Sequence, residues 1–276
     1  MCSRVDSLSQ TPAPAAAQLP SAGALHVGTS GWAYPTWKPD FYPPKTPAKK
    51  FLEHYASRLT SVEVNYTFRT LPTTKQLEGW LEATPDQFRF SFKAPQRITH
   101  FDRLRDCEEH VAQFTASLQP VRDAGKLGLL LFQLPPNFKA DADTRDRIGR
   151  LLDLPMLAGH RVAFEFRHES CFEEATCNIL RDHNAALCVA ESDDLKTPEI
   201  HTSGTHTAFR LRRNGGYTQA ELEAMAARLV VLAADREVFA YLKHEDEPTG
   251  PLNAVALLAA ARPETVALSS KLVKRR

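Results

Sequence analysis

Residues 161–168 read RVAFEFRH, a run in which apolar and polar residues alternate and which closes on two basic side chains. Alternation of β-forming residues with polar ones is typical of a strand. Seven more runs of β-formers occur along the chain, and nearly all are separated by enough residues for one helix. Strands and helices that alternate at this spacing predict parallel βαβ units, and eight such units close into a TIM-type (β/α)8 barrel. The seven runs are 26–30 (HVGTS), 61–68 (SVEVNYTF), 88–93 (FRFSFK), 126–134 (KLGLLLFQL), 186–193 (ALCVAESD), 207–213 (TAFRLRR) and 237–244 (EVFAYLKH).

The stretches between these runs carry apolar residues at helical spacing, as in the stripe Val111, Phe114, Leu118 and Val121. Each stripe predicts a helix face that packs on the sheet. Residues 195–206 (LKTPEIHTSGTH), between strands six and seven, contain Pro, Gly and Thr but no stripe. The sequence therefore predicts an α/β fold, a parallel eight-stranded barrel in which the helix between strands six and seven is reduced or absent.

Length and composition predict one folded domain with two tails. A chain of 276 residues with 43% hydrophobic residues can bury a large core, and a barrel of roughly 250 residues forms a single domain. We expect that domain at residues 24–262. Residues 1–23 are rich in Ala, Pro, Ser and Gln and predict a disordered N-terminal tail. Residues 263–276 are expected to form a C-terminal tail.

Charge and cysteine usage exclude several classes of partner. Lys and Arg (34) nearly balance Asp and Glu (33), so the sequence indicates neither nucleic acid nor a membrane surface as a partner. No run of about 18 apolar residues predicts a membrane span. The five cysteines lie far apart without a CxxC pair, which favours a reducing compartment. With no secretory signal in the first residues, we expect a cytoplasmic protein. Its oligomeric state stays open.

The direction of side chains along each strand identifies a candidate site. Alternate residues of a strand point to opposite faces. On strand two, Glu63 and Asn65 share one face and apolar residues share the other, so the polar pair is predicted to point into the barrel. The same rule predicts inward positions on the later strands for Ser91, Lys93, Leu131, Gln133, Glu165, Arg167, Val189, Glu191, Arg210, Arg212, Tyr241 and Lys243.

The inward set carries more positive than negative charge. Buried charges are costly unless they are paired or used by a ligand. An excess of about two positive charges favours an anionic small-molecule substrate, phosphorylated or carboxylated. The three carboxylates are Glu63, Glu165 and Glu191, and the five cations are Lys93, Arg167, Arg210, Arg212 and Lys243.

Six ordered motifs resemble those of the YecE-like family, domain of unknown function seventy-two. They are GTSGW (28–32), FYPP (41–44), VEVNYTF (62–68), FKAPQRITH (92–100), LLFQLPPNF (130–138) and FEFRH (164–168). The resemblance runs from about His26 to about Ala261. It implies a TIM-type barrel with a polar pocket at the strand C-termini, and it implies no assigned reaction. The motifs place Glu63, Asn65, Lys93, Gln133, Glu165, Arg167 and His168 on the characteristic positions of the family.

Acid–base chemistry is the function that we predict from this set. A lysine next to a carboxylate lowers the carboxylate pKa while burial raises it, so Glu165 and Lys93 form a pair that can be tuned for proton transfer. The predicted catalytic residues are Glu165, Lys93 and Glu63, in a lyase, isomerase or hydrolase that needs neither metal nor other cofactor. The predicted substrate-binding residues are Asn65, Gln133, Arg167, His168, Glu191, Arg210, Arg212, Lys243 and Trp32, the last by stacking.

Three alternatives remain open at this point. Lys93 could form a Schiff base with a carbonyl substrate. Glu63, Glu165 and Glu191 could bind Mg²⁺ or Mn²⁺, as in a metal-dependent sugar isomerase or phosphodiesterase. The fold could also serve as a non-catalytic scaffold that binds anions, since a fold alone does not dictate activity.

Overall fold

A computed structural model describes residues 24–191, 195–243 and 247–262. The expected tails, 1–23 and 263–276, lie outside the described residues. All paired strands run parallel and form two sheets, one of four strands in the order β1-β9-β8-β7 and one of five in the order β2-β3-β4-β5-β6. The strands are β1 (Leu25–Thr29), β2 (Ser61–Val64), β3 (Arg89–Lys93), β4 (Leu127–Gln133), β5 (Arg161–Glu165), β6 (Ala186–Leu187), β7 (Val189–Glu191), β8 (His206–Leu211) and β9 (Glu237–Leu242).

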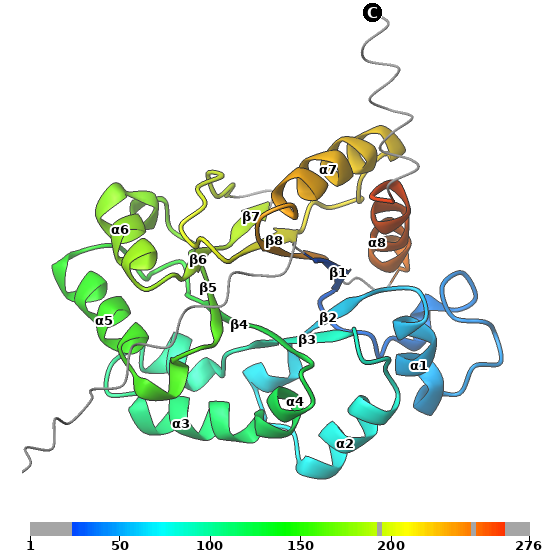
Figure 1. Ribbon diagram of the computed structural model, residues 1–276, viewed down its shortest axis with the longest axis horizontal. Coiled ribbons are helices and arrows are strands. Elements are labelled where there is room, and N and C mark those ends of the chain that lie inside the picture. Colours follow the sequence, from blue (N-terminus) through cyan, green and yellow to red (C-terminus); the bar gives the residue numbers. More distant parts are fainter. Residues whose placement is uncertain (1–23, 192–194, 244–246, 263–276) are drawn as a thin grey trace, which may run out of the picture.

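The helices lie around the outside of the strands (Figure 1). Their apolar faces are buried against the sheets, as the stripe in α3 shows with Val111 and Phe114 fully buried. Three helices begin with a capping box, in which Thr73, Asp141 or Thr218 accepts a backbone N–H of the first turn. The helices are α1 (Phe51–Ala56), α2 (Thr74–Glu82), α3 (Glu108–Ser117), α4 (Gln119–Asp123), α5 (Ala142–Leu152), α6 (Glu174–Asp182), α7 (Gln219–Leu232) and α8 (Thr249–Ala260).

The edges of the two sheets meet at two places. At β1 and β2, the backbone N–H of Thr60 donates to Val27 O (3.2 Å), and the N–H of Val27 donates to Thr60 Oγ1 (2.9 Å). Gly28 allows this approach, because a Cβ atom at that position would lie 1.8 Å from Ser61 O. At the other junction, β6 and β7 are separated by Cys188 alone, whose N–H donates to Phe164 O (2.8 Å).

A packed inner layer joins the two sheets. The Tyr241 hydroxyl, from β9, lies 2.7 Å from Ser61 Oγ on β2 and 2.6 Å from Ser91 Oγ on β3. Around it lies an apolar cluster of residues from both sheets. This cluster separates the C-terminal ends of the strands from their N-terminal ends. It consists of Leu129, Leu131, Ala163, Ala186, Cys188, Ala208, Phe239 and Tyr241.

The parallel α/β class predicted from the sequence is confirmed, while the strand pairing gives two sheets in place of the single eight-stranded sheet that was predicted. The single run predicted at 186–193 is two short strands, β6 and β7, and residues 192–194 lie outside the described chain. Residues 195–205 contain no helix, in agreement with the absence of an apolar stripe there. No helix in the described parts of the chain is long and apolar enough to cross a membrane.

Candidate active site

Arg210 lies between two buried carboxylates at the C-terminal side of the inner layer. Its Nη2 atom lies 2.7 Å from Glu63 Oε1, and its Nη1 atom donates to Glu165 Oε2. Glu63 is on β2, Glu165 ends β5, and Arg210 is on β8, so the cluster joins both sheets. The carboxylates are completely buried and Arg210 is 2% exposed. We call Glu63, Arg210 and Glu165 the buried triad.

Glu165 has two further partners, one on the neighbouring strand β4 and one just after the end of β5. The Gln133 side-chain amide donates to Glu165 Oε1 (3.0 Å), and Arg167 Nη2 lies 2.5 Å from the same oxygen. Burial raises the pKa of Glu165, but the charges of Arg210 and Arg167 outweigh burial and hold the pKa below its ordinary value. Glu165 is therefore ionised at neutral pH.

Lys93, the last residue of β3, has an ammonium group above the Phe68 ring, 4.0 Å from its centroid. Burial and the charge of Arg210 lower the pKa of Lys93 to about 8, against the opposing effects of Glu63 and Glu165. Lys93 therefore exchanges its proton near physiological pH, unlike an ordinary lysine.

Cations outnumber carboxylates around the buried triad. Burial and the charge of Arg210 also lower the pKa of the partly buried Arg212. The two carboxylates of the triad raise the pKa of Arg210 in spite of burial, so Arg210 stays charged. With Lys93, Arg167 and Arg212 added to Arg210, four cations face two carboxylates.

Four buried polar atoms of this region have no hydrogen-bond partner among the described residues. They include one acceptor on a triad carboxylate and donors on two guanidinium groups. Buried polar atoms are nearly always satisfied, so these atoms are open to a water molecule or a ligand. They are Glu63 Oε2, Asn65 Oδ1, Arg167 Nε and Arg210 Nε.

Ser30 and His100 are two neighbours that the sequence analysis did not include. Ser30 follows β1, and its hydroxyl donates to Glu63 Oε1 (2.8 Å). His100 lies in the π-helix Arg97–Phe101 and packs edge-on against Phe68, 4.9 Å between ring centroids. Burial and the charge of Lys93 lower the pKa of His100. The motif that contains Lys93 also contains His100, seven residues later, so the motif was the signal available for it.

Four predicted site residues have their described contacts away from the buried triad. Trp32 packs edge-on against Trp80, with 5.1 Å between ring centroids. His168 Nδ1 accepts the backbone N–H of Ser170 (3.2 Å) in the loop after β5. Lys243 donates to Asn214 Oδ1.

Glu191 is the fourth, and its predicted direction is wrong. The sheet register pairs Ala190 with Arg210 and Glu191 with Leu211, so Ala190 shares the face of Arg210 and Glu191 points away from it. The Glu191 carboxylate accepts the hydroxyl of Tyr217 (2.8 Å). Strand parity predicted the opposite because it took Val189 and Glu191 as inward, whereas Cys188 belongs to the inner cluster.

The predicted carboxylate set for a divalent metal is not assembled. Glu191 lies apart, and the Arg210 guanidinium is between the other two carboxylates. Over the described part of the chain, no group of three or more His, Cys, Asp or Glu side chains is arranged to hold a metal ion.

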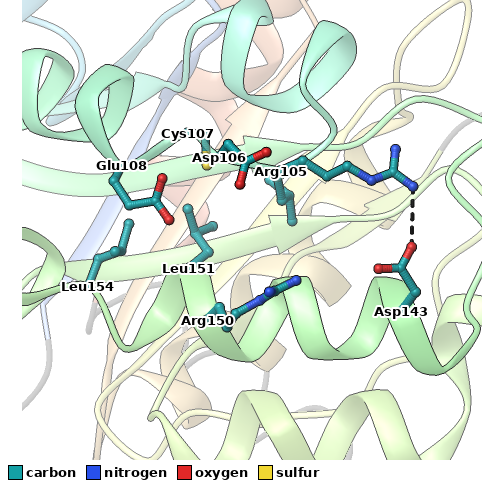
Figure 2. Close-up of a pocket in the computed structure, with 9 residues that line it drawn as sticks. Arg105, Asp106, Cys107, Glu108, Asp143, Arg150, Leu151 and Leu154 are labelled. Atoms are coloured by element: carbon teal, nitrogen blue, oxygen red, sulfur yellow. Dashed lines mark hydrogen bonds and ion pairs between the residues drawn. The ribbon is translucent and has the colours of Figure 1, made fainter.

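Two cavities lie away from the buried triad. One, of about 210 Å³, is on the helical layer between the loop before α3 and helix α5 (Figure 2). It contains the exposed ion pair of Arg105 with Asp143 (3.2 Å) and none of the predicted site residues. The other, of about 970 Å³, opens at the N-terminal ends of the strands.

Comparisons with known proteins agree on one family. The model of the family described as "Protein of unknown function DUF72" matches residues 26–275. The UPF0759 protein YunF of Bacillus subtilis is 31% identical over 159 residues, which cover 54% of this chain and 52% of YunF. The UPF0759 protein YecE of Escherichia coli K12 is 33% identical over 114 residues, 41% of this chain and 39% of YecE. The matches thus span about half or less of the length of these relatives.

A solved structure extends the similarity over most of the fold. The crystal structure of a DUF72 family protein from Thermotoga maritima superposes with a TM-score of 0.76 at 25% identity. The superposition covers 85% of this chain and 98% of the Thermotoga protein.

Proposed function

Since this chain belongs to the DUF72 family, whose members are described as proteins of unknown function, we propose its activity from its own residues: metal-independent acid–base chemistry on a small anionic substrate. The substrate bears a phosphate or carboxylate and binds at the C-terminal ends of the strands. The observation that carries this proposal is the buried triad with three further cations around it. A triad that only filled the interior would need no such excess of charge.

Substrate binding follows from the charge and the unsatisfied donors. Arg167 and Arg212 are partly buried, and guanidinium groups bind phosphate and carboxylate oxygens in pairs of hydrogen bonds. Arg167 Nε and Arg210 Nε have no described protein acceptor. An anion bound beside these arginines would neutralise the excess positive charge and accept hydrogen bonds from the two Nε–H groups.

Proton transfer is assigned to Lys93 and Glu63. Lys93, with a pKa of about 8, is present in both protonation states near neutral pH, as a general acid or base requires. Glu63 Oε2 has no described partner and can accept a proton or hydrogen bond from the substrate. Glu165, held ionised by two arginines, positions Arg210 and Arg167. Lyase, isomerase and hydrolase chemistry all fit this arrangement.

We further infer that the two sheets are two parts of one closed (β/α)8 barrel. The contacts between β1 and β2, the continuity of β6 with β7 and the shared inner cluster support closure. In a barrel, the C-terminal face carries the catalytic residues, and the buried triad lies on that side of the inner layer.

Turnover of defined compounds tests the proposal. The full chain is incubated with a panel of sugar phosphates and hydroxy acids, and conversion is followed by ¹H and ³¹P NMR. We expect one class to be converted, Lys93→Met to lower kcat by about 10²- to 10⁴-fold, and the exposed Lys49→Met control to keep full activity. Borohydride trapping of a covalent adduct at Lys93 would replace acid–base chemistry by a Schiff base.

Two outcomes would contradict the proposed function. Binding of these compounds without conversion would identify a non-catalytic scaffold. Activity that disappears with EDTA and returns with Mg²⁺ or Mn²⁺ would restore the metal-dependent alternative.

A further inference from the structure

The N-terminal ends of the strands line an open cleft at the opposite end of the inner layer. Its volume is about 970 Å³, and its wall includes the first residues of β3, β5, β8 and β9, which are Arg89, Arg161, His206 and Glu237. A smaller cavity of about 220 Å³ shares Arg89, Arg161 and the loop residues Gly159 and His160 with it, and adds Arg122. We call the two together the basal cleft.

Charge in the basal cleft is strongly unbalanced. Three arginines line it, and Glu237 is the one carboxylate among its lining residues. Arg161 pairs with Glu237. Arg89 donates to the backbone carbonyls of Asp86 (3.0 Å) and Phe88 (3.2 Å). Within the described chain, Arg89 has no carboxylate at ion-pair distance.

Arg122 is the second cation without a carboxylate partner in the described chain. Its Nη1 atom lies 3.3 Å from His160 Nε2, and its Nη2 atom lies over Gly159, 3.8 Å from where a Cβ would stand. Burial and the charges of Arg122 and Arg161 lower the pKa of His160. The histidine therefore stays neutral, and Arg89 and Arg122 are the two arginines of the cleft without a carboxylate partner in the described chain.

Other polar side chains of the cleft already have protein partners. The Asn184 side-chain oxygen accepts the N–H of Gly204 (2.9 Å), and His183 Nε2 lies 3.1 Å from Asp153 Oδ1. His206 Nε2 bonds to Val162 O (3.0 Å). The three arginines all line the smaller cavity, where their remaining N–H groups can donate to a ligand.

We propose that the basal cleft binds a phosphorylated small molecule, with the phosphate dianion held by Arg89, Arg122 and Arg161. Guanidinium groups match the oxygens of phosphate, and a dianion balances three cations and one carboxylate. The larger cavity, of about 970 Å³, exceeds what phosphate alone needs and lies within the range of small-molecule sites. This site is separate from the proposed active site, because the packed inner layer lies between them.

Equilibrium binding to the full chain tests the proposal. Isothermal titration uses ribose 5-phosphate, inorganic phosphate and ribose as probes. We expect ribose 5-phosphate to bind, inorganic phosphate to bind more weakly at the same site, and ribose not to bind. Arg89→Gln and Arg122→Gln should each raise the Kd for ribose 5-phosphate at least tenfold. Arg150→Gln, an exposed control on α5, should leave the affinity for ribose 5-phosphate unchanged.

Several results would overturn the basal site. The first is that ribose 5-phosphate does not bind at millimolar concentration. The second is that Arg150→Gln loses as much affinity as the cleft variants do. The third is that Arg167→Gln loses affinity for ribose 5-phosphate while Arg89→Gln retains it. The last result would place the anion at the proposed active site alone. Tighter binding of inorganic phosphate than of ribose 5-phosphate would identify a site for the free ion and refute the phosphorylated ligand.

Discussion

The two ends of the strands carry charged side chains in opposite arrangements. At the C-terminal ends, Glu63 and Glu165 are completely buried around Arg210. At the N-terminal ends, Glu237 is paired with Arg161 beside an open cleft. Strand parity brings charges to both ends, while packing decides whether they form a buried cluster or the wall of a cleft. Removing a charge should therefore cost far more stability at the C-terminal ends.

Arg210→Met should have the largest effect on stability. The substitution leaves two buried carboxylates without their shared cation, and breaking a buried pair in this way costs about 3–5 kcal/mol. Urea unfolding at pH 7 measures the loss, with the exposed Arg150→Met as the matched control. Adding Glu63→Gln and Glu165→Gln to Arg210→Met should recover part of it. A loss below about 1 kcal/mol would mean that the triad is not buried as described.

Glu237→Gln should have a smaller effect at the other end. Burial raises the pKa of Glu237, but His26 and Arg161 outweigh it and lower the pKa to about 2. The carboxylate therefore stabilises the folded state above its ordinary pKa near 4.5, and this contribution disappears as the pH falls toward 2.

We expect Glu237→Gln to cost about 1–2 kcal/mol at pH 7, because Arg161 is 36% exposed and solvent screens the pair. The difference in the free energy of unfolding between Glu237→Gln and the unsubstituted protein should shrink below pH 4.5. Urea unfolding between pH 2.5 and 7 measures it. A cost equal to that of Arg210→Met would remove the contrast between the two ends.

Lys93→Met should make the protein more stable. In the unfolded chain Lys93 has the ordinary pKa of 10.5, against about 8 in the folded protein, so between these values the unfolded chain binds the extra proton. Stability thus rises with pH from about 8 to about 10.5, and below pH 8 the full penalty of the buried charge is present. The variant should gain on the order of 1 kcal/mol at pH 7, and the gain should fade by pH 10.5. A gain that does not change with pH would contradict the lowered pKa.

Arg105→Gln should have the smallest effect, since its ion pair with Asp143 lies on the outer layer with both side chains more than half exposed. Exposed pairs contribute about 0–1 kcal/mol and weaken with salt. Thermal unfolding at low and high ionic strength measures this contribution. A loss above about 2 kcal/mol would show that the outer pocket in Figure 2 stabilises the fold as much as the strand ends do.

Much of the C-terminal site follows from the sequence because strand parity is a local rule. Glu63, Glu165 and Arg210 each lie on a strand of regular alternation, and their direction depends only on their neighbours in the chain. The rule failed at Glu191 because the wrong face of this run was taken as inward: Ala186 and Cys188 belong to the inner cluster, and Ala190 pairs with Arg210. Both faces of the run 186–190 carry only small or apolar residues, so the local sequence gives no clear signal for the inward face.

Strand parity also applies to the strand residues of the basal cleft, although the cleft was not predicted from the sequence. Arg161 shares the parity of Glu165, and Arg89 that of Lys93, so both were identifiable as inward positions at strand beginnings. They lie at the N-terminal ends of β3 and β5, whereas the predicted site residues lie at the C-terminal ends of the strands. Arg122 could not have been found in this way, because it lies on α4 and reaches the cleft only through the packing of that helix beside the loop at Gly159.

By itself, the sequence determined the alternation of strands and helices, the family and the side of each regular strand on which a charge lies, because these depend on local periodicity and ordered motifs. Only the tertiary structure decided that Arg210 lies between Glu63 and Glu165 while Glu191 turns to Tyr217, since partners on different strands are set by register. It also decided that one end of the strands is packed and the other open. Burial and pairing of charges come from distant parts of the chain, and these fix both the pKa of Lys93 and the uncompensated arginines of the basal cleft.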